Sequence, residues 1–268
     1  MYLKLGSVIL LIILIIVLFY FYYYYYYYKT NIHIFLLCYN ESVLLPHAIK
    51  HYKKYLPSCK ITIYDNESTD NSVKIAKKLG CNVITFNTNN KLNDYVIMHI
   101  KNNCWKHIHN GWIIVGDMDE FLCVTENELN NEKKLGTTIL NIEGYDMIGE
   151  SNSLDLSDID LQYIKKYNIL TDESKNMCFL RENIKEMNYC MGAHYCNPIG
   201  NNIKYSINTY INKHMSSLGL SYLINKHIKR YERAHDMRKL GYAVHYLNDN
   251  EKIKNNYIKD LNNCKLLY

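Results

Sequence analysis

The chain has 268 residues, of which 48% are hydrophobic and only three are proline, so it can bury a substantial core in one domain. Its formal charge of +5 is mild, and its basic residues form no continuous block, which gives no case for nucleic acid as a partner. The nine cysteines form no C-x-x-C pair and no zinc-binding spacing. Their odd number cannot pair fully, so they are typical of core residues in a reducing compartment and count against a disulfide framework.

The amino-terminal segment is predicted to be a membrane anchor. Residues from Val8 to Phe21 are continuously apolar, and the tyrosine tract from Tyr22 to Tyr28 extends them to about the length that crosses a bilayer. Tyrosine favours the membrane interface, and no small-residue cleavage site precedes Lys29. We therefore expect an uncleaved, single-pass anchor over residues 1–29. The side of the membrane stays open because basic residues nearly balance on the two sides.

Residues 31–115 alternate short apolar runs with amphipathic segments. The predicted strands are Asn31–Cys38, Ile61–Tyr64, Val83–Phe86 and Trp112–Val115. The predicted helices between them are Val43–Tyr55, Ser72–Leu79 and Asp94–His109. Strands that alternate with helices in this way predict an α/β fold with a mostly parallel sheet flanked by helices.

Beyond Val124 the alternation weakens. The expected elements are strands at Thr137–Asn141 and Met177–Leu180, a helix or loose loop at Leu156–Tyr167, a basic helix at Ser221–Leu240 and a surface helix at Glu251–Leu267. The basic helix either presents a solvated face or binds an anion, such as a lipid headgroup or a diphosphate. We expect one domain over residues 30–250 and a helical tail over residues 251–268.

Three carboxylates follow the fourth predicted strand within four residues: Asp117, Asp119 and Glu120. Ligands of open α/β sheets bind at the carboxyl ends of the strands, where such groups hold a metal, bond a ligand or stay in water. Asp117 and Asp119 would point to one side of an extended chain and could share a hard cation with a diphosphate. The alternative is a solvated acidic turn. Gly116, which lets a ligand approach closely, and the apolar Phe121 favour a binding site.

Asp65 repeats this pattern at the end of the second predicted strand. It stands too early in the sequence to cap the next helix, whereas at least one of Ser68, Thr69 and Asp70 is expected to do so. Two acids at the same edge of the sheet would converge on one crevice. The sequence therefore predicts a ligand site at this edge of the sheet.

These features resemble the family 2-like glycosyltransferases of the GT-A fold, in particular single-domain, membrane-anchored members of bacterial and viral type. The stretches that carry the resemblance in the first half are 38–41, 45–48, 63–72 and 116–122. Those in the second half are 192–194, His214, 218–222, Arg233 and 241–246. The likeness covers roughly residues 32–250, and the ordered combination is far more specific than any single stretch.

The resemblance implies a metal-dependent transferase that moves a sugar from a nucleotide-sugar donor to a hydroxyl of a glycan, protein or lipid-linked acceptor. The residues it places at the nucleotide are Asn40, Glu41, Asp65, Asn66, Asp70 and Asp117. It places Asp117 and Asp119 at a Mn²⁺ or Mg²⁺ ion, which neutralises the leaving diphosphate. His194 or His214 could complete that site, more readily for Mn²⁺.

The catalytic base is not fixed by the sequence. Asp146, Glu120 and Glu150 are all candidates, and a base must reach the acceptor hydroxyl, which sequence does not measure. The inverting or retaining outcome stays open for the same reason.

Two other interpretations remain. One is another nucleotidyl or nucleotide-sugar enzyme that uses Mg²⁺ or Mn²⁺, although residues 38–45 contain neither the glycine nor the lysine of a phosphate-binding loop. The other is a catalytically silent, membrane-anchored binding protein. The intact Asp65, Asp117 and Asp119 count against it.

Overall fold

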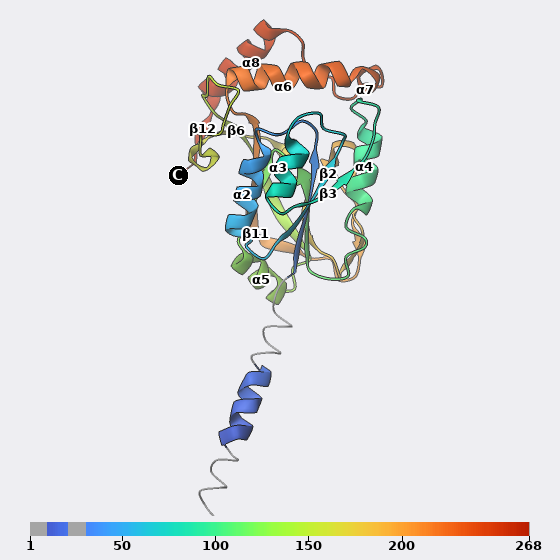
Figure 1. The fold of residues 1–268 in the computed structure, drawn as a ribbon, viewed down its shortest axis with the longest axis vertical. Coiled ribbons are helices and arrows are strands. Elements are labelled where there is room, and N and C mark those ends of the chain that lie inside the picture. The colour runs from blue at the N-terminus through green and yellow to red at the C-terminus, as the bar shows by residue number, and fades with distance from the viewer. Residues whose placement is uncertain (1–9, 21–30, 268) are drawn as a thin grey trace, which may run out of the picture.

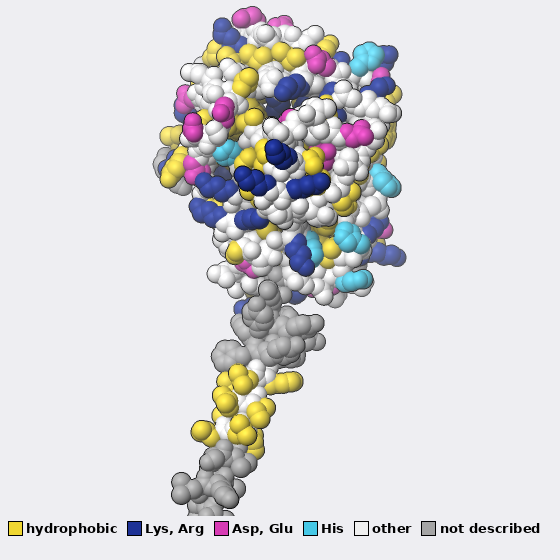
Figure 2. Space-filling view, viewed as in Figure 1, with side chains coloured by type: hydrophobic (Ala, Val, Ile, Leu, Met, Phe, Trp, Pro, Cys, Tyr) yellow, Lys and Arg dark blue, Asp and Glu magenta, His cyan; other side chains and the backbone are white. Residues whose placement is uncertain are grey.

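The computed structural model describes residues 10–20 and 31–267. Residues 10–20 form an α-helix whose apolar side chains are exposed (Figure 2). Within the described ranges, no helix combines the length and the apolar character needed to cross a bilayer. The rest of the predicted anchor, residues 1–9 and 21–29, lies outside the described residues.

The first half of the sheet is parallel, as predicted. Its strands run side by side in the order β3-β2-β1-β4. Their bounds are β1 (Ile32–Cys38), β2 (Lys60–Asp65), β3 (Asn82–Thr85) and β4 (Trp112–Asp117). The helices that connect them are α2 (Leu45–Tyr55), α3 (Ser72–Lys78) and α4 (Asp94–Asn103). The continuous apolar character of β1 and β4 follows from burial on both faces.

The second half adds antiparallel pairs. β8 (Cys178–Leu180) pairs with β4, and the sheet continues through β6 (Ile139–Ile148), β7 (Lys166–Ile169) and β12 (Lys265–Leu266). β11 (Tyr205–Ser217) lies parallel to β6 and antiparallel to β5 (Glu120–Cys123). The short elements are β9 (Ile184–Glu186), β10 (Ile199–Gly200), η1 (Leu161–Tyr163), η2 (Thr171–Glu173) and η3 (Met191–Ala193). The result is a mixed α/β fold whose central sheet is mostly parallel.

Three long elements of this half differ from the sequence prediction. β11 was not predicted because its polar side chains hide the strand pattern, and β6 is twice as long as the predicted Thr137–Asn141. Residues 156–167, expected to be a helix or a loose loop, are a loop with one 3₁₀ turn that leads into the start of β7. The basic helix breaks at Ala234 into α6 (Leu220–Arg233) and α7 (His235–Lys239).

The remaining helices cover the two ends of the sheet. α5 (Glu126–Lys134) begins with a capping box at Thr125, and α6 lies across the other end (Figure 1). The carboxyl-terminal helix α8 (Asn250–Asn263) lies within the predicted helical tail and packs against β6 and α6. Its Tyr257 is buried with Ile148 and Leu223, and the Tyr257 hydroxyl donates to the carbonyl of Gly149 at 2.6 Å.

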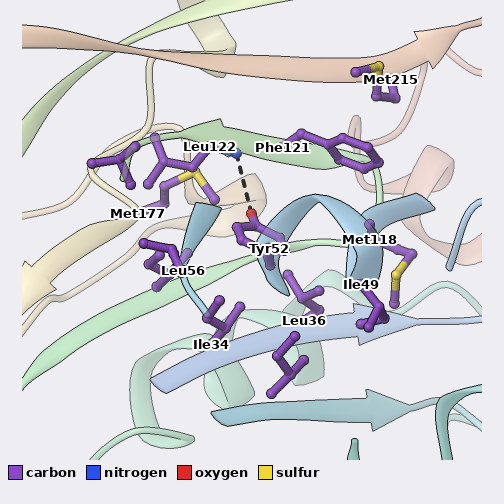
Figure 3. Packing of buried hydrophobic residues seen from close by; sticks show 14 of the residues in the cluster. Ile34, Leu36, Ile49, Tyr52, Leu56, Met118, Phe121, Leu122, Met177 and Met215 are labelled. Atoms are coloured by element: carbon purple, nitrogen blue, oxygen red, sulfur yellow. Dashed lines mark hydrogen bonds between the residues drawn. The ribbon is translucent and has the colours of Figure 1, made fainter. Parts of the chain in front are cut away.

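Tyr52 of α2 fixes the chain immediately after β4. Its hydroxyl donates to the carbonyl of Glu120 at 2.7 Å and accepts from the amide of Leu122 at 3.4 Å (Figure 3). Met118 and Phe121 pack in the same buried cluster. Full burial of a large apolar side chain contributes roughly 1.5–3 kcal/mol. The carboxylates of residues 117–120 therefore extend from a rigid base.

Candidate active site

Asp65 and Asp117 lie at the same edge of the sheet, as the sequence predicts. Asp65 is the last residue of β2 and lies in register with Cys38, while Asp117 is the last residue of β4 and lies in register with Leu37. The two carboxylates therefore stand on either side of the end of β1. This is the edge at which ligands of open α/β sheets bind.

One buried oxygen of Asp65 has no hydrogen-bond partner. The residue is 1% exposed, and its Oδ2 accepts from the amide of Ser68 at 3.0 Å, whereas Oδ1 lacks a donor within the described protein. An unsatisfied buried acceptor is costly, so such a group is well suited to accept an N–H from a ligand. The neighbouring Asn66 is also buried, but its side chain is hydrogen-bonded to Thr88. The side chain of Asn66 is therefore already occupied by Thr88 and helps to hold the chain after β2 in place.

Asn40 and Asp70 hold the loops after β1 and β2 together. The Oδ1 of Asn40 accepts from the amides of Thr69, at 2.7 Å, and Asp70, at 3.2 Å. The Asp70 carboxylate accepts from the amides of Ser72, at 2.9 Å, and Ser42, at 3.0 Å. The hydrogen bonds of both residues therefore organise the rim of the site. That Asn40 and Asp70 also contact a nucleotide stays a prediction.

Glu120 is a buried structural group, which disfavours the prediction that it is the base. It is 1% exposed, its Oε2 accepts from the amide of Asp117 at 2.8 Å, and its Oε1 pairs with Lys175 at 2.5 Å. Burial raises the pKa of Glu120 to about 7 against the opposing charge of Lys175. A carboxylate so enclosed supports Asp117 but is not placed to meet an acceptor.

Asp117 is one-third exposed and is backed by two buried lysines. Its Oδ2 lies 2.8 Å from Nζ of Lys101 and 4.0 Å from Nζ of Lys175. Lys101 is only 2% exposed, an unusual burial for lysine that requires such a partner. Neither lysine was identified from the sequence. Their positions, within an amphipathic helix and an irregular loop, gave no charge pattern to find them by.

Asp119 is 3% exposed, and three cationic or ionisable groups surround one of its oxygens. Its Oδ2 lies 2.6 Å from Nζ of Lys226, 3.5 Å from Nε2 of His214 and 3.5 Å from the guanidinium of Arg230. Burial alone would raise the pKa of Asp119, but Lys226 and His214 together hold it well below its usual range. Asp119 therefore remains ionised inside the protein.

His214 connects Asp119 to Asp146. Parallel pairing of β11 with β6 sets His214 opposite Asp146, and Nδ1 of the ring lies 3.0 Å from Oδ1 of that carboxylate. Ser216 donates to the same oxygen at 2.6 Å. Burial lowers the pKa of His214, but the carboxylate of Asp119 on one side and that of Asp146 on the other raise it to about 10. Asp146 is thus the candidate base that is linked to Asp119 through His214.

Of the three remaining candidates, Glu150 and His194 form no hydrogen bond or ion pair with Asp117, Asp119 or His214 within the described residues, whereas Glu41 lies near Arg230. Glu150 is exposed and pairs with Lys166 at 2.5 Å. His194, a predicted metal ligand, donates from Nδ1 to the carbonyl of Asp172 at 2.6 Å. Glu41 of the first loop lies 3.9 Å from Arg230, and burial raises its pKa to about 7 against the charge of Arg230. Of these three groups, Glu41 alone approaches the cluster.

The predicted set of four metal ligands is not assembled. In the described part of the chain, no three histidine, cysteine, aspartate or glutamate side chains gather as ligands of one ion would. Asp117 and Asp119 offer the oxygen atoms that Mg²⁺ and Mn²⁺ prefer, but ammonium groups lie against both carboxylates. Asp117 and Asp119 therefore supply two suitable donors for an ion, and each is ion-paired with a lysine in this structure.

Comparison with known proteins supports a glycosyltransferase. Residues 33–117, under half of the chain, match the family model described as Glycosyl transferase family 2. A curated relative, Protein RfbJ of Shigella flexneri, is 34% identical over 53 residues, which are 20% of this chain and 41% of RfbJ. The chain therefore spans about two-fifths of the length of that relative. The matched segment contains the loops after β1 and β2 and ends at Asp117.

Two solved structures are similar to this chain at low sequence identity. S. aureus TarS 1-349 is 12% identical, with 86% of this chain and 80% of that chain covered and a TM-score of 0.41. The mannosyltransferase PcManGT from Pyrobaculum calidifontis, solved with GDP-Man and Mn²⁺, is 13% identical, with 42% and 35% covered and a TM-score of 0.33. Both TM-scores are below 0.5.

Proposed function

We propose that this protein transfers a sugar from a nucleotide-sugar donor to a hydroxyl group of an acceptor. The observation that carries the proposal is the unpaired, buried oxygen of Asp65, which shares one sheet edge with Asp117 inside the segment that matches the glycosyltransferase family. A nucleobase N–H is the kind of donor that this oxygen lacks. The nucleoside would then lie at Asp65 and the diphosphate toward Asp117 and Asp119.

In the transfer step, the acceptor hydroxyl oxygen forms a bond to the anomeric carbon while the bond from that carbon to the diphosphate oxygen breaks. The hydroxyl proton passes to a base, and the nucleoside diphosphate leaves with the bonding electrons. We propose Asp146 as the base, because it is partly exposed and is joined through His214 to Asp119. A divalent ion held by Asp117 and Asp119 would add neutralising charge at the diphosphate.

Release of nucleoside diphosphate tests the function. The full-length chain is assayed against a panel of sugar nucleotides with Mn²⁺, with Mg²⁺ and with EDTA, and calorimetry measures nucleotide binding. Asp65→Asn should weaken nucleotide binding, because the amide presents a donor in place of one carboxylate oxygen. Asp158→Asn, at an exposed position, is the matched control. If the folded wild-type protein neither binds nor cleaves any nucleotide sugar, the proposal is wrong.

Asp146→Asn separates chemistry from binding. We expect a loss of at least about 100-fold in turnover, the usual contribution of a general base, with donor affinity nearly unchanged. An equal loss in donor affinity would instead make Asp146 a positioning residue for His214. Metal dependence is read from the EDTA arm of the same assay.

We also propose that residues 1–29 tether the domain to a membrane. The support is the apolar run of residues 8–21 together with the exposed apolar helix at residues 10–20. Extraction of the expressed chain from membranes at high pH tests this, since only an inserted segment resists such treatment. Complete release into the supernatant would contradict it.

A further inference from the structure

Helix α6 carries basic side chains toward the carboxylate cluster. Lys226 and Arg230 are four residues apart and therefore lie on one face of the helix. Both approach Oδ2 of Asp119, at 2.6 Å and 3.5 Å. Figure 1 shows α6 lying across the end of the domain, over the other elements. The helix thus brings two cations to the edge of the sheet where Asp65 and Asp117 also lie.

Lys226 and Arg230 offer more hydrogen-bond donors than the nearby carboxylates use. The side chains of Lys226 and Arg230 are only 10% and 30% exposed, and removal of such charges from water is costly. Their shared carboxylate partner is a single oxygen of Asp119, which His214 also approaches. The second carboxylate near Arg230 is that of Glu41, at 3.9 Å. Several cations that converge on one oxygen retain donors for a further anion.

The arrangement around Arg230 keeps its guanidinium in place. One Nη donates to the hydroxyl of Tyr246 at 2.5 Å, and the guanidinium lies 5.4 Å from the centre of that ring. The next basic residue of the row, Arg233, stacks at 3.2 Å over the ring of Tyr39, which belongs to the loop after β1. α6 is therefore connected to the loop that forms the rim of the site.

We propose that Lys226 and Arg230 form the binding site for the diphosphate of the donor. The inference rests on the proposed function and specifies which residues receive the charge of the leaving group. Arginine binds phosphate oxygens through two parallel donors, and lysine acts as a point charge. As the anomeric carbon–oxygen bond breaks, negative charge grows on the diphosphate, where fixed cations stabilise it most.

A purely structural ion pair is the competing explanation. Under it, Lys226 and Asp119 would only fasten α6 to the sheet, and the loss of Lys226 would lower stability without any preference for one nucleotide over another. Lys229 supplies the matched control, because it lies on the same helix, is exposed and has no ion pair in the described part of the chain. Lys226→Arg, which keeps the charge, is the conservative variant.

The test compares nucleoside diphosphate with monophosphate binding in EDTA. Calorimetry on the full-length chain uses both forms of uridine and of guanosine. We expect wild type and Lys229→Met to prefer the better-bound diphosphate over its monophosphate by about tenfold or more, as charge-assisted hydrogen bonds warrant. Lys226→Met and Arg230→Gln should each lose most of that preference, and Lys226→Arg should keep it.

Chemical labelling of the wild-type chain provides a second test beside calorimetry. Amine-reactive labelling of the wild-type chain, read by mass spectrometry, should show Lys226 protected by diphosphate but not by monophosphate, with Lys229 labelled equally in both. The inference would be overturned if Lys226→Met and Arg230→Gln kept the preference for diphosphate, or if Lys226 were labelled equally with diphosphate and with monophosphate. Release of nucleoside diphosphate from a sugar nucleotide would in that case still support the transferase. Absence of any nucleotide binding by folded wild type would instead remove the proposed function.

Discussion

Lys175 is the cation on which the buried carboxylates behind Asp117 depend. Its Nζ lies 2.5 Å from Glu120, 2.9 Å from Glu173 and 4.0 Å from Asp117, and its side chain is 5% exposed. Lys175→Met keeps the length of the side chain and removes the charge. Glu120, at 1% exposure, would then be left in the protein interior without its counterion.

The expected loss of stability is large. Removal of one partner of a buried ion pair costs about 3–5 kcal/mol, because the remaining charge is uncompensated. A domain of ordinary stability has a free energy of unfolding of about 5–15 kcal/mol, so the variant should approach the limit of folding. Urea unfolding of wild type and variant, followed by circular dichroism, gives the difference directly.

The stability lost in Lys175→Met should depend on pH in a definite direction. Burial already raises the pKa of Glu120 to about 7, and the loss of Lys175 should raise it further. A carboxyl group whose pKa is higher in the folded than in the unfolded state destabilises the fold as pH rises above the unfolded value of about 4.5. The variant should therefore be closer to wild type at pH 5 than at pH 8.

Lys106→Met is the matched control. Lys106 pairs with Glu186 at 2.7 Å, but about a third of each side chain is exposed. Such pairs contribute about 0–1 kcal/mol. A Lys175→Met variant that loses no more stability than the control, at either pH, would refute the argument that the cluster depends on a buried charge. Lys175→Met combined with Glu120→Gln should recover part of the loss.

Three further changes have defined outcomes. Gly116→Ala should lower the free energy of unfolding by about 1–3 kcal/mol in urea, because the added Cβ would lie 2.7 Å from Cε of Met177 and 2.9 Å from Oε2 of Glu120. Gly116→Ser adds the same Cβ and should cost at least as much. His51 donates to the carbonyl of Leu122, and burial lowers its pKa from 6.5 to about 4. Wild type should thus lose about 3 kcal/mol of unfolding free energy between pH 7 and pH 4 from this group, because the unfolded chain binds the proton first, and His51→Gln should flatten that part of the profile. Thr125→Ala removes the cap of α5 and should cost about 1 kcal/mol, a loss that Thr125→Ser should largely avoid.

The sequence by itself determined the parallel half of the sheet and the residues at its edge. Apolar runs that end in polar groups mark buried strands and their carboxyl ends, so Asp65 and Asp117 were placed together before any contact was known. The cap expected within residues 68–70 was one position early: the N-cap of α3 is Asn71, which makes no side-chain capping hydrogen bond, and Asp70 before it accepts from the amide of Ser72. Information of this kind is carried by neighbouring residues.

The partners of these carboxylates were decided only by the tertiary structure. Lys101, Lys175 and Lys226 come from a helix, a loop and a distant helix, and no sequence spacing joins them to the residues at 117–120. The sequence of β11 shows no clear alternation of polar and apolar residues, although this strand sets His214 opposite Asp146. A buried charge is tolerated only where another element supplies its counterion, and chain topology alone decides which element that is.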